Sequence, residues 1–114
     1  MKTFILAILL PLLIVVTALG GDNGKISSVV IDVRSESEWN TGHLEGAVLI
    51  PHERIAHEIT KVVSSKKTNI YLYCRSGRRS SLAIDELKKS GYENLTNLGT
   101  VEQASNKLNR QIVK

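Results

Sequence analysis

The chain has 114 residues, a formal net charge of +4 at pH 7 and an aromatic content of only 4%. Its lysines and arginines are scattered apart from one short cluster, and few aromatic rings are present for base stacking, which argues against a nucleic-acid-binding protein. The single cysteine excludes a disulfide within the chain, so it is a reactive thiol, half of an intermolecular bridge or an inert buried residue.

The first predicted element is a secretory signal peptide over residues 1–20. A basic start at Lys2 precedes an apolar run over residues 4–19, which ends in small residues before Gly20. A retained membrane anchor is the alternative. It is disfavoured because Pro11 interrupts the run, which is shorter than the roughly 20 apolar residues that span a bilayer. We expect cleavage near Gly20, a periplasmic or secreted location and no stable membrane insertion after cleavage.

Residues 21–27 are expected to form a polar lead-in, and residues 28–114 a single small domain. Compact apolar segments predict strands, and helical periodicity or capping signals predict helices. In chain order these are strand 29–33, helix 35–39, strand 47–50, helix 53–63, strand 69–73, helix 80–89, strand 94–98 and helix 101–108. Strands separated by helices predict an α/β fold, with a central, mostly parallel sheet and helices on both faces.

Cys74 lies between the predicted strand 69–73 and the predicted helix 80–89. Ligands of parallel α/β sheets bind beyond the carboxyl ends of the strands, so this position is a candidate site. A lone cysteine is more often a small buried hydrophobic residue than a nucleophile. Here the flanking residues favour the nucleophile, because amides at a helix N-terminus stabilise the thiolate and lower the thiol pKa.

Three arginines follow Cys74 within five positions, and a glycine lies among them. The arginines are Arg75, Arg78 and Arg79. Their charges would attract an anionic substrate and stabilise charge that moves between sulfur and a leaving group. Gly77 allows the amides of this segment to turn inward and surround an anion. We call residues 74–80 the cysteine loop.

Several motifs, in order, resemble the signatures of rhodanese domains. They are Asp-Val-Arg at 32–34, Glu-Trp at 38–39, Gly-His-Leu-Glu-Gly-Ala at 42–47, Ile-Pro at 50–51, the segment 73–80, Gly-Tyr at 91–92 and Asn-Leu-Gly at 97–99. The resemblance spans about residues 28–100. With its predicted signal peptide, the protein is most similar to the small single-domain periplasmic rhodaneses of the phage-shock type. It departs from the pattern at Thr100, where a second glycine usually follows.

The resemblance implies a sulfurtransferase that needs no cofactor. Cys74 would take the outer sulfur of thiosulfate or another sulfane-sulfur donor, release sulfite, and pass the sulfur from a persulfide to cyanide or a thiol acceptor, which could be a dithiol protein. The implied substrate-binding residues are Arg75, Ser76, Gly77, Arg78 and Arg79. Their amides would hold the persulfide, and we expect the guanidinium of Arg78 or Arg79 to bind thiosulfate.

The length of the cysteine loop argues against a related chemistry. Cysteine phosphatases of the related fold place five residues between cysteine and arginine, whereas four residues separate Cys74 from Arg79. The histidine that precedes the phosphatase cysteine is replaced by Tyr73. A tighter loop suits one sulfur atom better than a tetrahedral phosphate.

Two non-enzymatic functions remain as alternatives to a thiosulfate sulfurtransferase. One is a persulfide carrier or redox partner protein, which the sequence does not separate from the enzyme. The other is a catalytically silent rhodanese-like binding module, against which Cys74 and its cationic loop argue. The small size and the lack of a second apolar face predict a monomer.

Asp32 and Arg34 lie at the carboxyl end of the first predicted strand. We favour a structural ion pair between them. The alternative hypothesis is that Asp32 neutralises and orients an arginine of the cysteine loop, since both segments should reach the same edge of the sheet. Either role would support the site without contacting substrate.

The remaining candidate residues are assigned structural roles. His43, His52 and His57 lack metal-ligand spacing with one another and with Cys74, so no metal site is expected. His43 is expected to make a structural hydrogen bond. Trp39 is expected to pack in the core under the first helix.

Overall fold

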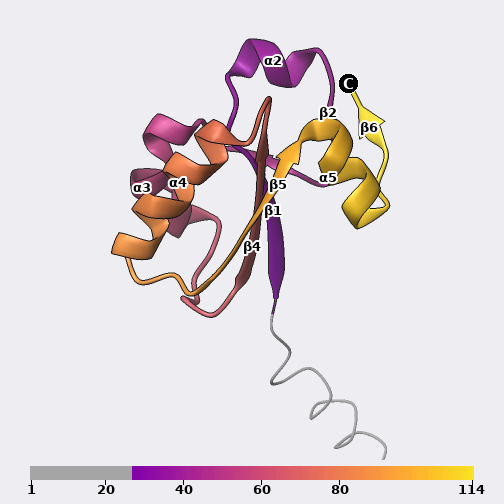
Figure 1. Cartoon of the computed structure of the whole chain (residues 1–114). Helices are drawn as coiled ribbons and strands as arrows, with labels where there is room; N and C mark the ends of the chain where they lie inside the picture. Colours follow the sequence, from indigo (N-terminus) through magenta and orange to yellow (C-terminus); the bar gives the residue numbers. More distant parts are fainter. Residues whose placement is uncertain (1–26) are drawn as a thin grey trace, which may run out of the picture.

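The computed structural model of the chain describes residues 27–114 (Figure 1). The predicted signal peptide over residues 1–20, and the lead-in up to residue 26, lie outside the described residues. Within residues 27–114, none of the helices has the length and apolar character needed to cross a bilayer.

A four-stranded parallel sheet forms the centre of the domain, with the strand order β3-β1-β4-β5. Its strands are β1 (Ser28–Asp32), β3 (Val48–Leu49), β4 (Asn69–Cys74) and β5 (Asn94–Thr100). Each corresponds to a predicted strand, and the predicted α/β fold class is confirmed. The last strand extends to Thr100, beyond its predicted end, because it stays paired with β4 as far as Cys74.

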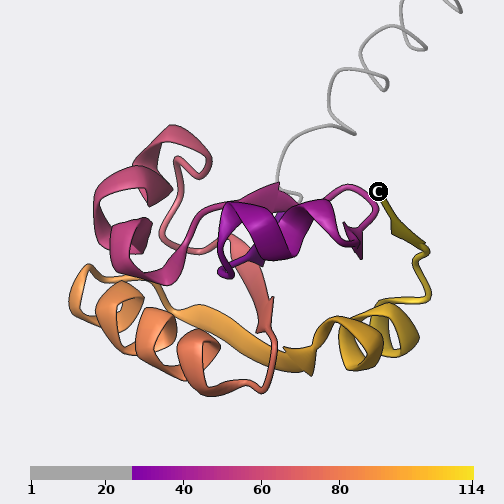
Figure 2. The same cartoon turned by 90° about the horizontal axis from the view of Figure 1, so that it is seen from above.

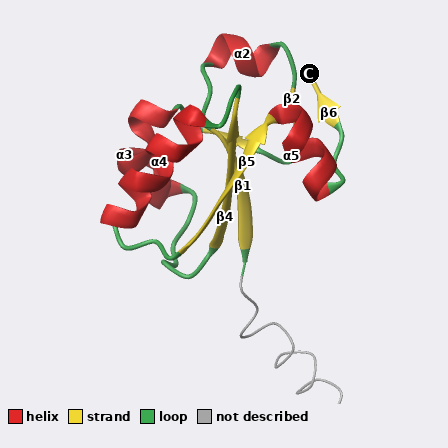
Figure 3. Ribbon diagram, in the orientation of Figure 1, coloured by secondary structure: helices red, strands yellow, loops and turns green. Residues whose placement is uncertain are grey.

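Helices cover both faces of this sheet (Figures 1 and 2). The helices are α2 (Glu36–Asn40), α3 (Ile55–Glu58), α4 (Arg78–Lys89) and α5 (Val101–Leu108). α3 and α4 pack on one face and α5 on the other, as the colouring by secondary structure shows (Figure 3). α2 begins with the predicted capping box, in which the hydroxyl of the N-cap Ser35 accepts a hydrogen bond from the Glu38 amide and the Glu38 carboxylate accepts one from the Ser35 amide.

The predicted continuous helix over residues 53–63 is wrong. The segment consists of a 3₁₀ turn η1 (His52–Arg54), the short α3 and a second turn η2 (Ile59–Lys61). Ile55, Ile59 and Val63 recur every four residues and are all buried, as a helix would bury them. Successive short turns satisfy the same apolar spacing, so periodicity alone did not reveal the breaks.

A small second sheet was absent from the predictions. β2 (His43–Leu44) pairs antiparallel with β6 (Ile112–Val113) and brings the C-terminal segment beside the chain that follows α2. Each strand has two residues. Two residues are too few to show the alternating pattern by which strands are recognised.

Alternation along β4 decides which way Cys74 points. Ile70, Leu72 and Cys74 belong to the apolar cluster beneath α3 and α4, whereas Tyr73 belongs to the cluster beneath α5. Successive strand residues point to opposite faces, so the thiol lies on the face that α4 covers. The strand therefore delivers the sulfur directly beneath the helix that follows the cysteine loop.

Thr100, the departure from the rhodanese pattern, is the N-cap of α5. Its hydroxyl accepts a hydrogen bond from the Gln103 amide, and Gln103 Oε1 accepts one from the Thr100 amide at 2.9 Å. The preceding Gly99 has φ of +88°. The turn thus keeps the one glycine that its backbone needs and gains a helix cap at the next position.

We predict that Gly99→Ala destabilises the domain by about 2–3 kcal/mol, measured by urea denaturation. The positive φ disfavours any Cβ by about 1–2 kcal/mol, and a Cβ here would collide with Gln103 Oε1 and disturb the capping box. Gln103→Ala is the control, since it removes the cap alone at about 1 kcal/mol. A loss for Gly99→Ala no larger than that of the control would contradict the assignment.

Candidate active site

The cysteine loop begins at the carboxyl edge of the sheet. Cys74 is the last residue of β4 and pairs in register with Thr100, while the preceding Tyr73 pairs with Asp32. Gly77 ends the turn as the N-cap of α4, with φ of +92°. A side chain is disfavoured in this backbone conformation, which explains the glycine. The turn reverses the chain so tightly that the first amides of α4 lie near the cysteine.

Main-chain donors surround the sulfur, as the sequence predicted. The Gly77 amide donates a hydrogen bond to Cys74 Sγ at 2.9 Å. Burial acts to raise the pKa of Cys74 and is the largest single effect, but hydrogen bonds from Ser80, Ser76 and Gly77 together lower the pKa below its ordinary value. The direction agrees with the expectation. The groups that lower the pKa of Cys74 most are main-chain amides and one hydroxyl, with no arginine among them.

Cys74 has no exposed surface. Its side chain packs with Leu72 and Ala83 in the cluster beneath α4. The sulfur nevertheless accepts hydrogen bonds on the side of the loop, so it is neither in a wholly apolar site nor at the surface. A reactant has to bring a small atom into the cysteine loop to reach it.

The arginines of the cysteine loop have different partners. Arg79 forms two parallel hydrogen bonds with Glu38, at 2.7 and 2.8 Å, and these bonds hold the pKa of the Glu38 carboxyl well below its usual range. The charge of Arg79 is therefore compensated. Arg75 and Arg78 are exposed, and neither has an ion-pair partner in the part of the chain that the structure describes.

Asp32 and Arg34 form the predicted structural ion pair. Arg34 Nη2 lies 2.7 Å from Asp32 Oδ2, and it also donates to the carbonyl of Gly42 at 2.7 Å. Both residues are buried. Removing one partner would leave the other as an unpaired buried charge and destabilise the fold by about 3–5 kcal/mol. The alternative role for Asp32 is wrong, because Glu38 is the carboxylate that holds Arg79, and the hydrogen bonds of the Asp32 carboxylate go to Arg34.

His43 makes the structural hydrogen bond expected of it, with its Nδ1 3.0 Å from the carbonyl oxygen of Trp39. Its ring stacks on the Trp39 indole, with 3.5 Å between ring centroids. Trp39 is only partly buried, so its predicted core position is wrong. The indole instead covers the imidazole at the end of α2.

Ser80 is a site residue whose side chain was given no role by the sequence, although it ends the cysteine loop and begins the predicted helix. It is fully buried, and its hydroxyl has no hydrogen-bond partner among the described residues 27–114. A buried hydroxyl without a partner is unfavourable by about 1–3 kcal/mol. The group that this hydroxyl can satisfy is the Cys74 thiolate, because Ser80 gives the largest of the effects that lower the thiol pKa. The sequence signal that could have identified Ser80 is its position in the first helical turn after the nucleophile.

Asn97 was quoted only as part of a motif, yet it supports the same loop. Its Nδ2 donates to the Gly77 carbonyl at 2.9 Å, and its Oδ1 accepts from the Gly99 amide at 2.9 Å. One amide side chain thus joins the end of β5 to the cysteine loop. This bridge fixes the orientation of the Gly77 peptide beside the sulfur.

We predict that Ser80→Ala raises the pKa of Cys74. A lost donor leaves the thiolate less stabilised than the neutral thiol, so the midpoint of alkylation against pH moves upward. A hydrogen bond to a charged group contributes about 1.5 kcal/mol or more, which corresponds to roughly tenfold slower alkylation near pH 7. Ser90→Ala removes an exposed hydroxyl at the other end of α4 and should leave the profile unchanged. Identical profiles for all three proteins would refute a role for Ser80.

Comparison with known proteins agrees with this geometry. The family model of the rhodanese-like domain matches residues 17–102. The chain is 38% identical over 85 residues to a putative mitochondrial thiosulfate sulfurtransferase of Schizosaccharomyces pombe, covering 65% of this chain and 60% of that protein. It is 33% identical over 69 residues to the thiosulfate sulfurtransferase PspE of Escherichia coli, covering 60% of this chain and 66% of that one. The matches thus span somewhat under two thirds of each relative.

The fold is also that of solved rhodaneses. A structure of a rhodanese with anions from E. coli superimposes with a TM-score of 0.71 and 28% identity, over 77% of this chain and 99% of the other. A rhodanese-like domain from Anabaena superimposes with a TM-score of 0.67 and 25% identity, over 77% of this chain and all of the other. With a parallel sheet that ends in a cysteine loop, and a family model that covers most of the described residues, the chain belongs to the rhodanese-like domain family.

Proposed function

We propose that this protein is a sulfurtransferase that moves sulfane sulfur from thiosulfate, or a similar donor, to an acceptor through a persulfide on Cys74. The observation that carries the proposal is the hydrogen bond from the Gly77 amide to Cys74 Sγ, in a loop whose donors lower the thiol pKa. The two relatives named thiosulfate sulfurtransferase support the choice of donor.

The first half-reaction begins with the Cys74 thiolate. It attacks the outer sulfur of thiosulfate, the bond between the two sulfurs of the donor breaks, and sulfite leaves with the electron pair. The product is a persulfide whose outer sulfur stands about 2 Å from Sγ. Because Cys74 itself is fully buried, this added length brings the transferable atom toward the opening of the cysteine loop.

The second half-reaction returns the enzyme to its starting state. A cyanide ion or a thiolate acceptor attacks the outer sulfur, and the bond to Sγ breaks with its electron pair on Cys74. The leaving group is the same thiolate that the Gly77 amide and the Ser80 hydroxyl stabilise. One set of donors therefore assists both halves of the reaction, and ping-pong kinetics are expected.

We also propose that the protein works after export, in a periplasmic or extracellular compartment. The support is the basic start and the apolar run within residues 1–20. An exported enzyme would meet its sulfur donor and acceptor outside the cytoplasm. Mass spectrometry of the secreted or periplasmic fraction would identify the N-terminal residue that remains.

We predict steady production of thiocyanate from thiosulfate and cyanide. The protein should also gain the mass of one sulfur, about 32 Da, when it is mixed with thiosulfate alone, because the persulfide forms before any acceptor binds. Cys74→Ser should abolish both signals. A mass gain without repeated turnover would identify a persulfide carrier, and no mass gain would rule out the Cys74 persulfide.

We further predict that Arg78→Gln raises KM for thiosulfate about three- to tenfold. Arg78 is exposed in the cysteine loop without an ion-pair partner in residues 27–114, so its charge is free to attract a dianion. Near the surface such an interaction contributes on the order of 1 kcal/mol. Lys88→Gln, which removes the same charge at the other end of α4, is the control. A KM equal to that of the control would contradict the role of Arg78.

A further inference from the structure

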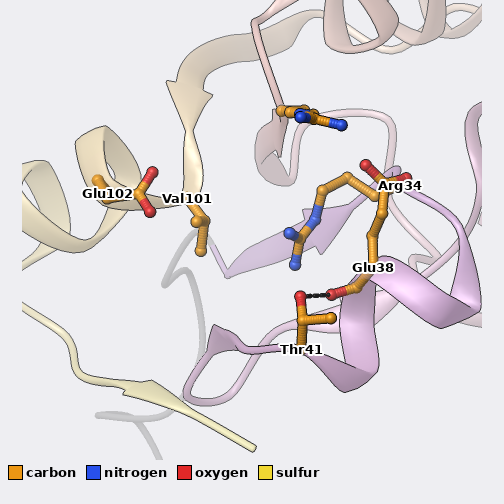
Figure 4. A pocket seen from close by; sticks show the side chains of 6 residues that line it. Arg34, Glu38, Thr41, Val101 and Glu102 are labelled. Carbon is orange, nitrogen blue, oxygen red and sulfur yellow. Dashed lines mark hydrogen bonds between the residues drawn. The ribbon is translucent and has the colours of Figure 1, made fainter.

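A pocket of about 470 Å³ lies at the same edge of the sheet as the cysteine loop (Figure 4). It is lined by Arg34, Glu38, Thr41, Arg75, Val101 and Glu102. Arg75 directly follows Cys74, and Val101 directly follows Thr100, the partner of Cys74 across the sheet. The pocket therefore lies next to the end of β4, where Cys74 is the last residue.

Most polar groups of the pocket already have partners. Arg34 binds Asp32, the Glu38 carboxylate binds Arg79, and Thr41 Oγ1 donates to the main-chain oxygen of Glu38 at 2.6 Å. These groups form a fixed wall. Figure 4 shows Glu38 and Thr41 on one side of the pocket, Val101 and Glu102 on the opposite side, and Arg34 between them.

Two charged side chains of opposite sign remain without a partner among the described residues. Arg75 projects from the cysteine loop, and Glu102 belongs to the first turn of α5. Both are exposed, and neither occurs in an ion pair within residues 27–114. A pocket that offers one cation and one anion complements a ligand with both a carboxylate and an ammonium group.

The volume of the pocket narrows the class of ligand. Pockets of about 300–1,000 Å³ take up small organic molecules, whereas a two-atom cyanide ion would leave most of this space empty. Val101 provides the apolar part of the pocket lining, which suits the methylene of an amino acid side chain. The chemistry fits an amino-acid-like molecule better than a simple anion.

We propose that this pocket is the acceptor subsite, and that it binds a small zwitterionic thiol of the cysteine type. The carboxylate of the acceptor lies on Arg75, its ammonium group on Glu102, and its sulfur points toward Cys74. This assignment rests on the proposed function, because the acceptor has to reach a persulfide. In this assignment Arg75 binds the acceptor, whereas Arg78 binds the donor thiosulfate.

The transfer step balances with the groups present. The acceptor thiol loses its proton to solvent, and its thiolate attacks the outer sulfur of the Cys74 persulfide. A bond forms between the acceptor sulfur and the transferred sulfur, while the bond to Cys74 Sγ breaks and leaves a thiolate there. The products are a persulfide of the acceptor and the free enzyme, and no external oxidant or reductant takes part.

The test replaces the proposed ammonium-binding carboxylate by Glu102→Gln. Thiosulfate is the donor, and the acceptors are cysteine, N-acetylcysteine, which lacks the ammonium charge, and cyanide. Sulfite release is measured with each. KM for cysteine should rise about five- to tenfold, while the constants for N-acetylcysteine and cyanide stay as in the unsubstituted protein. Glu93→Gln, an exposed carboxylate just before β5, is the matched control and should change none of them.

The possible failures are distinct. An active enzyme whose KM for cysteine does not respond to Glu102→Gln, or responds equally for N-acetylcysteine, overturns the subsite and leaves the sulfurtransferase in place. Turnover with a dithiol protein but not with cysteine also overturns it. A protein that releases no sulfite beyond a single turnover with any of the three acceptors overturns the proposed function, and the subsite with it.

Discussion

The Cys74 sulfur is held in a place that would normally suppress its reactivity. Full burial against the cluster beneath α4 raises the pKa of a thiol, and in this loop hydrogen bonds directed at the sulfur reverse the effect. The Gly77 amide and the Ser80 hydroxyl lie on the side where α4 begins. The geometry of the strand-to-helix turn, rather than the charge of the loop, therefore decides whether this cysteine ionises.

Other contacts serve mainly to keep that turn in one conformation. Asn97 holds the Gly77 peptide from the side of β5, and Glu38 holds Arg79 from the side of α2. Glu38 also completes the capping box with Ser35, so the start of α2 and the cysteine loop are fixed by one carboxylate. The arginines consequently have separate roles. Arg79 is part of the scaffold, whereas the exposed Arg75 and Arg78 are free to meet ligands.

Much of the fold followed from local patterns. The strands of the parallel sheet, the capping box at Ser35 and the helix over residues 101–108 were predictable, because each depends on residues close together in the chain. The broken helix near Ile55 and the two-residue strands gave no such signal. At the site, Cys74 and its loop were evident from their spacing. The pairing of Glu38 with Arg79 joins positions 41 residues apart, and one sequence cannot reveal that contact or the inward orientation of Ser80.

The central claim is that the donors of its own turn lower the pKa of a fully buried Cys74. An ultraviolet difference titration of the thiolate, with Cys74→Ser as the reference protein, tests it most directly, because it requires neither substrate nor acceptor. The account predicts a pKa for Cys74 below that of free cysteine. A pKa at or above the free value would mean that burial outweighs the hydrogen bonds, and that this sulfur is not held as the nucleophile described here.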